Sequence, residues 1–304
     1  MKTLILDCNN LLYRTFWLSK NKTLTNSRGE NVGGVYFFLN CIKSYTKQYE
    51  PDRIFAAWDK KLTWPSSNFR KEMLSVQYKG NRNYTPFEGV HNYDDLIQQM
   101  LSNLNIKNIY PNVMEADDVI AWLCHKLDGE KIVVSTDKDM WQLVDNDTKI
   151  FFPTGKKEIN LSNFQREAGI AKEHYLLYKC VLGDISDNVK GVEGYGKVKA
   201  KKVAENGISM LTEEQQQIVH TNLKLSDLNY GYRYYPEEEI CYKEQLAQLQ
   251  DNTADMESFK DIVSYLELDS ITKDINMWVN TFEKKKNITK CIEDLKKRLN
   301  IWYE

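Results

Sequence analysis

The chain has 304 residues, of which 42% are hydrophobic and 28% are charged, and its formal net charge at pH 7 is −2. This composition is typical of a folded globular protein and excludes a disordered or collagen-like chain. A near-neutral total charge also excludes binding of nucleic acid through a strongly basic overall field, so any such binding must depend on local basic segments.

The ends and cysteines of the chain indicate its compartment. Asp7 interrupts the first apolar run, so the N-terminus does not have the pattern of a signal peptide, and no apolar run approaches the ~18 residues of a membrane span. The six cysteines lie far apart without a CxxC pair, which favours reduced thiols and argues against a structural zinc site. We therefore expect a cytoplasmic protein without membrane contact.

The first half of the chain alternates strand and helix patterns. Continuous apolar runs predict buried strands at 3–6, 54–58, 106–110, 131–136 and 149–152. Periodic apolar positions predict intervening helices at 9–18, 35–42 and 91–104, and a further helix from 115. Strands that alternate with helices predict an α/β core with a mostly parallel sheet, which we place at residues 1–160.

Acidic residues follow three of the predicted strands, namely Asp7, Asp59 and Asp137. The helix from residue 115 opens with three more acids, namely Glu115, Asp117 and Asp118. One aspartate at a strand end is common because aspartate favours turns, and acids at a helix start interact favourably with the helix dipole. Because parallel strands present their carboxyl ends at one edge, all six together predict an acid-lined site there.

Such a cluster needs positive charge, because neighbouring carboxylates repel one another. Oxygen ligands without histidine or cysteine suit magnesium or manganese. Two such ions ~4 Å apart can activate a water and stabilise an in-line phosphoryl displacement. The basic segment 60–82 and the lysines of 197–202 supply cationic surface for a phosphodiester substrate.

The second half of the chain is predominantly helical, with predicted helices at 173–182 and 197–204. The glycine-rich segment 183–196 between them permits tight turns and leaves amides free to contact phosphate. Beyond residue 206 the chain is polar and helical, and its sequence predicts no function.

These motifs resemble those of the 5′-nuclease superfamily of flap endonucleases and 5′-3′ exonucleases. The motifs resemble most those of compact bacteriophage enzymes and of the 5′-nuclease domain of bacterial DNA polymerase I. The resemblance covers about residues 3–205. It is carried by Asp7 with Asn10 and Arg14, Asp59, the run 78–82, the run 115–118, Asp137 with Asp139, and the run 183–188 leading to Gly191, Gly194 and Gly196.

The resemblance implies a PIN-like sheet, a helical arch at about 60–90, and a helical DNA-binding region at 161–304 with a helix-three-turn-helix at about 173–205. It also implies two Mg²⁺ ions, with Mn²⁺ as a substitute, and a K⁺ ion at the helix-three-turn-helix. The first metal would be held by Asp7, Asp59, Glu115, Asp117 and Asp118. The second would be held by Asp137, Asp139, Asp184 and Asp187. Lys79 and Arg82, at the base of the arch, would complete the catalytic set by holding the scissile phosphate.

DNA contacts implied by the resemblance fall on Arg14, Gly33, Gly34, Arg70, Tyr78, Lys79, Arg82, Gly191, Gly194, Gly196, Lys197 and Lys199. Arg70 also fits a solvated basic face with a phosphate contact, and Tyr78 could stack on a base. Asp139 taken singly also fits a helix N-cap, and Asp184 and Asp187 also fit turn formers. Lys190 and Glu193 replace prolines that are usual in the family, so the glycine-rich loop should be less rigid.

We expect a 5′-nuclease that acts on DNA with a 5′ end, flap or branch and on RNA–DNA hybrids, leaves 5′-phosphates, and removes replication primers or acts in repair. It would be a monomer in a bacterial or phage-infected cell, with single-strand-binding protein, clamp or polymerase as candidate partners. Two alternatives are a single-strand ribonuclease of related fold and a non-catalytic protein that binds DNA junctions.

Overall fold

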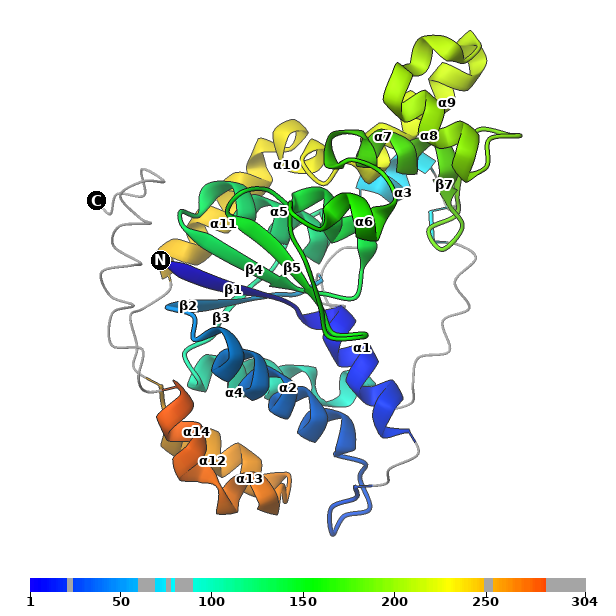
Figure 1. Ribbon diagram of the computed structural model, residues 1–304. Helices are drawn as coiled ribbons and strands as arrows, with labels where there is room; N and C mark the ends of the chain where they lie inside the picture. The colour runs from blue at the N-terminus through cyan, green and yellow to red at the C-terminus, as the bar shows by residue number, and fades with distance from the viewer. Residues whose placement is uncertain (21–23, 60–68, 75–77, 80–89, 249–253, 283–304) are drawn as a thin grey trace.

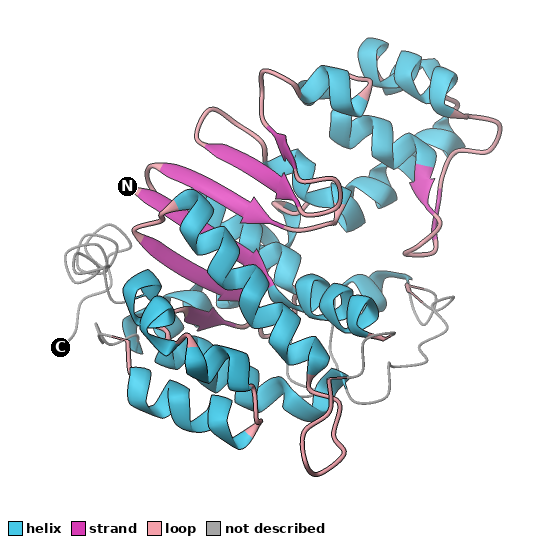
Figure 2. Ribbon diagram, turned by 60° about the horizontal axis from the view of Figure 1, so that its bottom comes forward, coloured by secondary structure: helices cyan, strands magenta, loops and turns pink. Residues whose placement is uncertain are grey.

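The computed structural model describes residues 1–20, 24–59, 69–74, 78–79, 90–248 and 254–282. A six-stranded sheet with the order β3-β2-β1-β4-β5-β6 lies at the centre, with helices on both faces (Figures 1 and 2). The strands are β1 (Lys2–Asp7), β2 (Arg53–Ala57), β3 (Lys107–Ile109), β4 (Glu130–Val134), β5 (Thr148–Phe152) and β6 (Lys157–Ile159). The first five are parallel, as predicted. The antiparallel β6 was not predicted, because three residues after a turn give too short a pattern.

Helices connect the strands and form the second half of the chain. Around the sheet lie α1 (Cys8–Ser19), α2 (Gly33–Tyr49), α3 (Phe69–Leu74), α4 (Asp94–Asn103) and α5 (Ala116–Lys126). The next group is α6 (Phe164–Ala168), α7 (Lys172–Leu182), α8 (Lys197–Asn206), α9 (Glu213–Ser226), α10 (Tyr230–Tyr234) and α11 (Pro236–Gln248). The last are α12 (Met256–Tyr265), α13 (Asp269–Lys273) and α14 (Ile275–Phe282). Among the described helices, none has the length and apolar character needed to cross a bilayer.

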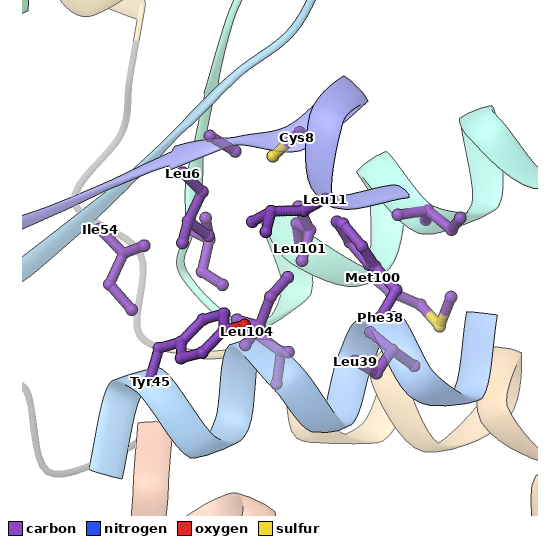
Figure 3. Close-up of a cluster of buried hydrophobic side chains, with 14 of the residues drawn as sticks. Leu6, Cys8, Leu11, Phe38, Leu39, Tyr45, Ile54, Met100, Leu101 and Leu104 are labelled. Carbon is purple, nitrogen blue, oxygen red and sulfur yellow. The ribbon is translucent and has the colours of Figure 1, made fainter. Parts of the chain in front are cut away.

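Alternate residues of each strand face opposite cores, as the two-residue period of a strand requires. Leu4 and Leu6 of β1 belong to the core beneath the sheet, where α1, α2 and α4 pack (Figure 3). Ile5 belongs to the core on the other face, with α5 and α11. Both faces of the parallel sheet are therefore buried, which explains its continuous apolar runs.

The last helices return to the first core. Phe259 of α12 and Trp278 of α14 are fully buried there, and their rings lie 5.3 Å apart. Part of the region that had no predicted role thus completes the core beneath α2. The separation into regions 1–160 and 161–304 stays a prediction. The expected arch at 60–90 lies largely outside the described residues, except for α3, residues 78 and 79, and residue 90.

Helices α1 and α2 approach closely at Gly34. A Cβ atom at Gly34 would lie 2.3 Å from the buried ring of Phe16. We expect Gly34→Ala to lower the free energy of unfolding by about 1–3 kcal/mol, since overpacking outweighs the gain in helix propensity. Urea unfolding checks this, and Phe16→Leu in the same chain should restore part of the loss. A more stable Gly34→Ala variant would contradict the close packing.

Candidate active site

Three aspartates meet at the carboxyl edge of the sheet because β1 lies between β2 and β4. Asp7 ends β1 and caps α1, accepting the backbone N–H of Asn10 at 3.3 Å. Asp59 follows β2, and Asp137 follows β4. Burial, together with the charges of Asp59 and Asp137, raises the pKa of Asp7 to about 7. The three strand-end aspartates therefore lie together at one edge of the sheet, as predicted.

Helix α5 brings two more acids to this edge. Asp59 accepts the backbone N–H of Ala116 at 2.9 Å, which ties the start of α5 to the end of β2. Glu115 is the N-cap of α5, and Asp117 lies in its first turn. Burial, then Asp137 and Asp7, raise the pKa of Asp117 well above its ordinary value. Such crowding of like charges marks a place where a cation would be stabilised.

The second group of acids lies beside Lys179 of α7. Its ammonium contacts Asp139 and lies 3.7 Å from Asp184. Asp184 also forms a turn, because it accepts the backbone N–H of Ser186 at 2.8 Å. Asp137, not Asp139, is the N-cap of the following 3₁₀ helix, since it accepts the Asp139 N–H at 2.8 Å. The N-cap alternative for Asp139 is therefore wrong.

Lys79 connects the two groups of acids. Its ammonium lies 2.6 Å from Glu115, and its backbone N–H donates to the Asp187 carbonyl at 3.0 Å. Burial opposes the charge of Glu115, but the charges of Lys79 and Arg70 outweigh it and lower the pKa of Glu115 to about 2. Lys79 itself has a raised pKa, because Glu115 outweighs its burial. The Glu115 carboxylate and the Lys79 ammonium are thus both charged at neutral pH.

Arg70 and Asp118 form a buried ion pair rather than a surface contact. The Arg70 side chain is 2% exposed, and its two terminal nitrogens lie 2.7 and 2.8 Å from the Asp118 oxygens. The Arg70 Nε also donates to the Leu225 carbonyl at 2.8 Å. The expectation of a solvated, phosphate-binding Arg70 is therefore wrong. Asp118 is fully buried with both oxygens on Arg70, so this structure favours a positioning role over metal ligation.

Tyr78 also differs from its predicted role. Its side chain is buried, and its hydroxyl, the single donor, lies 3.0 Å from a Glu115 oxygen and 3.3 Å from an Asp187 oxygen. A buried ring cannot stack on a base, so that expectation is wrong. Arg82 lies outside the described residues, and its predicted role stays a prediction.

The glycine-rich segment forms a short hairpin of β7 (Gly183–Asp184) and β8 (Val189–Lys190), followed by α8. Gly191 is needed for packing, since a Cβ atom there would lie 2.1 Å from the Leu182 carbonyl oxygen. Gly194 and Gly196 are exposed and have open space around them. Lys197 and Lys199 of α8 are exposed as well. The DNA-binding role of these four residues stays a prediction, and close packing explains Gly191 without a DNA contact.

The remaining predicted DNA contacts lie on α1 and α2. Arg14 is half-buried on α1, seven residues beyond Asp7. Gly33 and Gly34 are buried at the start of α2, where Gly34 packs on Phe16. Close helix packing therefore explains Gly34 without a DNA strand, and the contact of this helix start with DNA stays a prediction.

A cleft of about 850 Å³ joins the second group of acids to the basic helix. Asp137, Asp139 and Asp184 line one part of it, and Lys197 and Lys201 of α8 line another. An anionic chain in this cleft would contact both lysines while one of its phosphates reached the acids. The cleft thus provides the cationic approach that a carboxylate cluster needs for a phosphodiester.

The donor chemistry of the cluster fits divalent cations. It offers carboxylate oxygens without histidine or cysteine, and burial, together with neighbouring carboxylates, raises the pKa values of Asp7, Asp117 and Asp137. Within the described residues, no group of three or more potential ligand side chains already forms a closed shell for an ion. Side chains such as that of Glu115, now paired with Lys79, would therefore have to shift when a metal binds.

Two site residues were not predicted from sequence. Ser135 is fully buried, donates to Asp7 at 2.5 Å and accepts the Asp137 N–H at 2.9 Å, so it joins the ends of β1 and β4. Lys179 neutralises part of the second group. The sequence held a signal for Lys179, because this residue lies five positions before Asp184 on a helix, α7, that ends next to the acids.

A family model and the related proteins of known name agree on one family for this chain. A family model described as the 5′-3′ exonuclease N-terminal resolvase-like domain matches residues 2–172. A 5′-3′ exonuclease of Mycoplasmopsis pulmonis is 31% identical over 209 residues, which are 67% of this chain and 66% of that protein. DNA polymerase I of Caldicellulosiruptor bescii is 30% identical over 219 residues, which are 69% of this chain and 25% of the polymerase. The chain thus spans about a quarter of the polymerase relatives it matches.

Solved structures show the same fold. The T5 D15 protein, co-crystallised with metal ions, has a TM-score of 0.59 and 21% identity, over 91% of this chain and 99% of that one. The flap endonuclease-1 of Methanococcus jannaschii has a TM-score of 0.55 and 17% identity, over 94% of each chain. At these low sequence identities the similarity shows a shared fold and nothing further. It confirms the expected α/β architecture.

The pKa of Asp7 predicts a pH-dependent stability. Because burial raises this pKa from 3.8 to about 7, the folded state binds the proton more tightly than the unfolded state. The free energy of unfolding, measured with chelator, should therefore fall as pH rises from about 4 to about 7. Asp7→Asn should raise it at pH 8 by at least ~1 kcal/mol, since one pKa unit corresponds to ~1.4 kcal/mol.

The matched control is Asp261→Asn, which changes an exposed carboxylate of α12 and should leave the pH profile unaltered. Added Mg²⁺ should stabilise the wild type more than Asp7→Asn. An Asp7→Asn variant less stable than the wild type at pH 8 would show that the cluster does not strain the fold.

The buried ion pair predicts a large single-residue effect. Asp118→Ala leaves the Arg70 guanidinium buried without its main partner and should lower the free energy of unfolding by about 3–5 kcal/mol. The double variant Arg70→Met with Asp118→Leu should recover much of this loss. Lys157→Gln is the control, because it breaks an exposed pair with Glu167 that is worth under ~1 kcal/mol. Equal losses in denaturant unfolding of Asp118→Ala and the control would refute this account.

Proposed function

Because the chain belongs to the 5′-3′ exonuclease family, we propose that it is a structure-directed 5′-nuclease that hydrolyses phosphodiester bonds of DNA. The observation that carries this proposal is the continuity of the carboxylate cluster with the cleft toward Lys197 and Lys201. A site with this charge pattern suits an anionic backbone whose scissile phosphate meets divalent cations.

The proposed cofactor is a pair of Mg²⁺ ions, with Mn²⁺ as a substitute. Asp7, Asp59, Glu115 and Asp117 would hold one ion, and Asp137, Asp139, Asp184 and Asp187 the other. Bound there, the ions would lower the pKa of a water and stabilise charge on the attacking and leaving oxygens. The T5 D15 protein, which has the same fold, was co-crystallised with metal ions, and this supports a metal-dependent site.

The protein's own residues would position and neutralise the substrate. Lys79 stays cationic because its pKa is raised, and its ammonium would exchange Glu115 for the scissile phosphate. Arg82 would assist from the arch. Developing negative charge in the transition state would then face a preorganised cation. Attack by water on phosphorus breaks the bond to the 3′ oxygen, so the products carry a 5′-phosphate and a 3′-hydroxyl.

The substrate range of the proposal includes flaps, branches and 5′ ends of DNA and also RNA–DNA hybrids. Lys197, Lys199, Gly194 and Gly196 would hold duplex phosphates, with K⁺ at this helix-three-turn-helix. Arg14 would contact the strand near the acids. Primer removal during replication or repair is the proposed task, with polymerase, clamp or single-strand-binding protein as candidate partners of a monomer.

Cleavage of an end-labelled 5′-flap duplex tests the proposal. We expect cutting near the junction with Mg²⁺ and none with chelator. Asp137→Asn should abolish cutting, and Lys79→Ala should slow single-turnover cleavage by about 10²–10³-fold, as loss of a preorganised charge does. Asp261→Asn is the control and should cut like the wild type.

Other outcomes identify the alternatives. Cleavage of free single-stranded RNA in preference to the flap duplex would indicate the single-strand ribonuclease of related fold. Tight binding of the junction without cleavage in Mg²⁺ or Mn²⁺ would indicate a non-catalytic junction-binding protein. Undiminished cutting by Asp137→Asn would refute the two-metal assignment.

A further inference from the structure

Helix α11 (Pro236–Gln248) lies outside the family-matched residues 2–172, yet it packs beside α5, the helix that carries the site acids (Figure 1). The ring of Tyr242 lies 5.2 Å from that of Trp122 in α5, and both side chains are fully buried. Lys126 at the end of α5 pairs with Glu239 at 2.9 Å. One helix from the second half of the chain thus contacts α5 at its middle, through Trp122, and at its C-terminal end, through Lys126.

The same α11 face also holds the segment that leads into α5. Glu238 is fully buried, and its two oxygens accept the backbone N–H groups of Asn112 at 2.9 Å and Val113 at 2.5 Å. One and two turns of helix separate Glu238 from Tyr242 and Gln245. Gln245 accepts the N–H of Tyr110 at 2.9 Å and donates to its carbonyl at 2.7 Å.

These four hydrogen bonds fix a segment without regular structure. Strand β3 ends at Ile109 and α5, capped by Glu115, begins at Ala116, so residues 110–114 lie outside both the sheet and the helix. Backbone N–H groups outside regular structure need other acceptors, and here side chains of α11 provide them. Glu115 follows Val113 by two residues, which places a site carboxylate immediately beyond the held segment.

The arch base depends on the same segment. The Phe69 N–H at the start of α3 donates to the Val113 carbonyl at 3.4 Å. The next residue, Arg70, pairs with Asp118 of α5 and bonds to Leu225 at the end of α9. The position of Val113 therefore affects both Glu115 and the helix that precedes Lys79.

We propose that Glu238 and Gln245 are positioning residues that set the place of Glu115 for metal binding and cleavage. This inference rests on the proposed nuclease function. Glu238 suits the task because a carboxylate offers two acceptor oxygens to two adjacent N–H groups. An amide in its place offers one oxygen and turns an NH₂ group toward the other N–H.

The test compares Glu238→Gln with Glu239→Gln in the full chain. Glu239 is the matched control, because it is the neighbouring acid, pairs with Lys126 and Lys243, and does not touch the segment 110–115. Gln245→Glu is a second variant that keeps the acceptor for the Tyr110 N–H and loses the donor to its carbonyl. Single-turnover flap cleavage, DNA affinity in chelator and Mn²⁺ affinity by calorimetry are measured for each.

We expect Glu238→Gln to slow single-turnover cleavage by about 10–100-fold at saturating Mg²⁺, the size of loss that misplacement and altered supporting hydrogen bonds produce. Its Mn²⁺ affinity should fall at least about 5-fold, while DNA affinity in chelator changes less than about 2-fold. Gln245→Glu should show a smaller loss with the same pattern, and Glu239→Gln should match the wild type.

The outcomes separate this inference from the proposed function. If Glu238→Gln lowers thermal stability but leaves the cleavage rate of the folded protein and its Mn²⁺ affinity unchanged, Glu238 is only structural and the inference is overturned. If the wild type binds Mn²⁺ but does not cleave, the nuclease proposal fails, and a fall in Mn²⁺ affinity of Glu238→Gln would still support the positioning of Glu115. Wild type that neither cleaves nor binds Mn²⁺ overturns both.

Discussion

Repulsion among carboxylates at one edge of the sheet is the constraint on which the rest of the site depends. The topology forces Asp7, Asp59 and Asp137 together, because β2, β1 and β4 are neighbours and parallel. Asp7 is buried, so the solvent that would screen its charge is removed, and its pKa rises to about 7 as a result. A fold optimised for stability alone would avoid this arrangement, which indicates that the cluster is retained for a cationic ligand.

Two lysines and an arginine relieve part of the repulsion, in different ways. Arg70 is held on both sides by Asp118 and the Leu225 carbonyl, so it is a fixed part of the structure. Lys79 and Lys179 are partly exposed and hold their acids through single ammonium groups. A bound phosphate or metal could replace these contacts without unfolding anything. The protein therefore combines permanent neutralisation in its core with exchangeable neutralisation at the site.

The sequence predicts the strand-end acids well, because short apolar runs that end in aspartate follow a local rule and the parallel topology does the rest. It misassigns Arg70 and Tyr78, since nothing local shows that the partner of Arg70 lies 48 residues away in Asp118 or 155 residues away at Leu225. Glu238 escapes notice for the same reason, as its partners lie 125 and 126 residues away. Local patterns thus place the ligands, whereas long-range contacts decide which polar residues are structural.

The distribution of charge along the sheet explains why net charge gave little guidance. Cations lie at the amino ends of the strands, where Lys2 donates to the Tyr49 carbonyl at 2.9 Å and Arg53 to the Thr3 hydroxyl at 2.7 Å. These cations balance the acids in the net charge of the chain, but they do little to reduce the electrostatic repulsion among the acids. Strands of five or six residues separate them by roughly 16–20 Å, where two unit charges interact by about 1 kcal/mol at an effective dielectric constant of ~20. Lys79, at 2.6 Å from Glu115, acts at a far shorter distance. Neutralisation of the acids is therefore local, which is why an overall charge of −2 is compatible with the anionic backbone proposed as substrate.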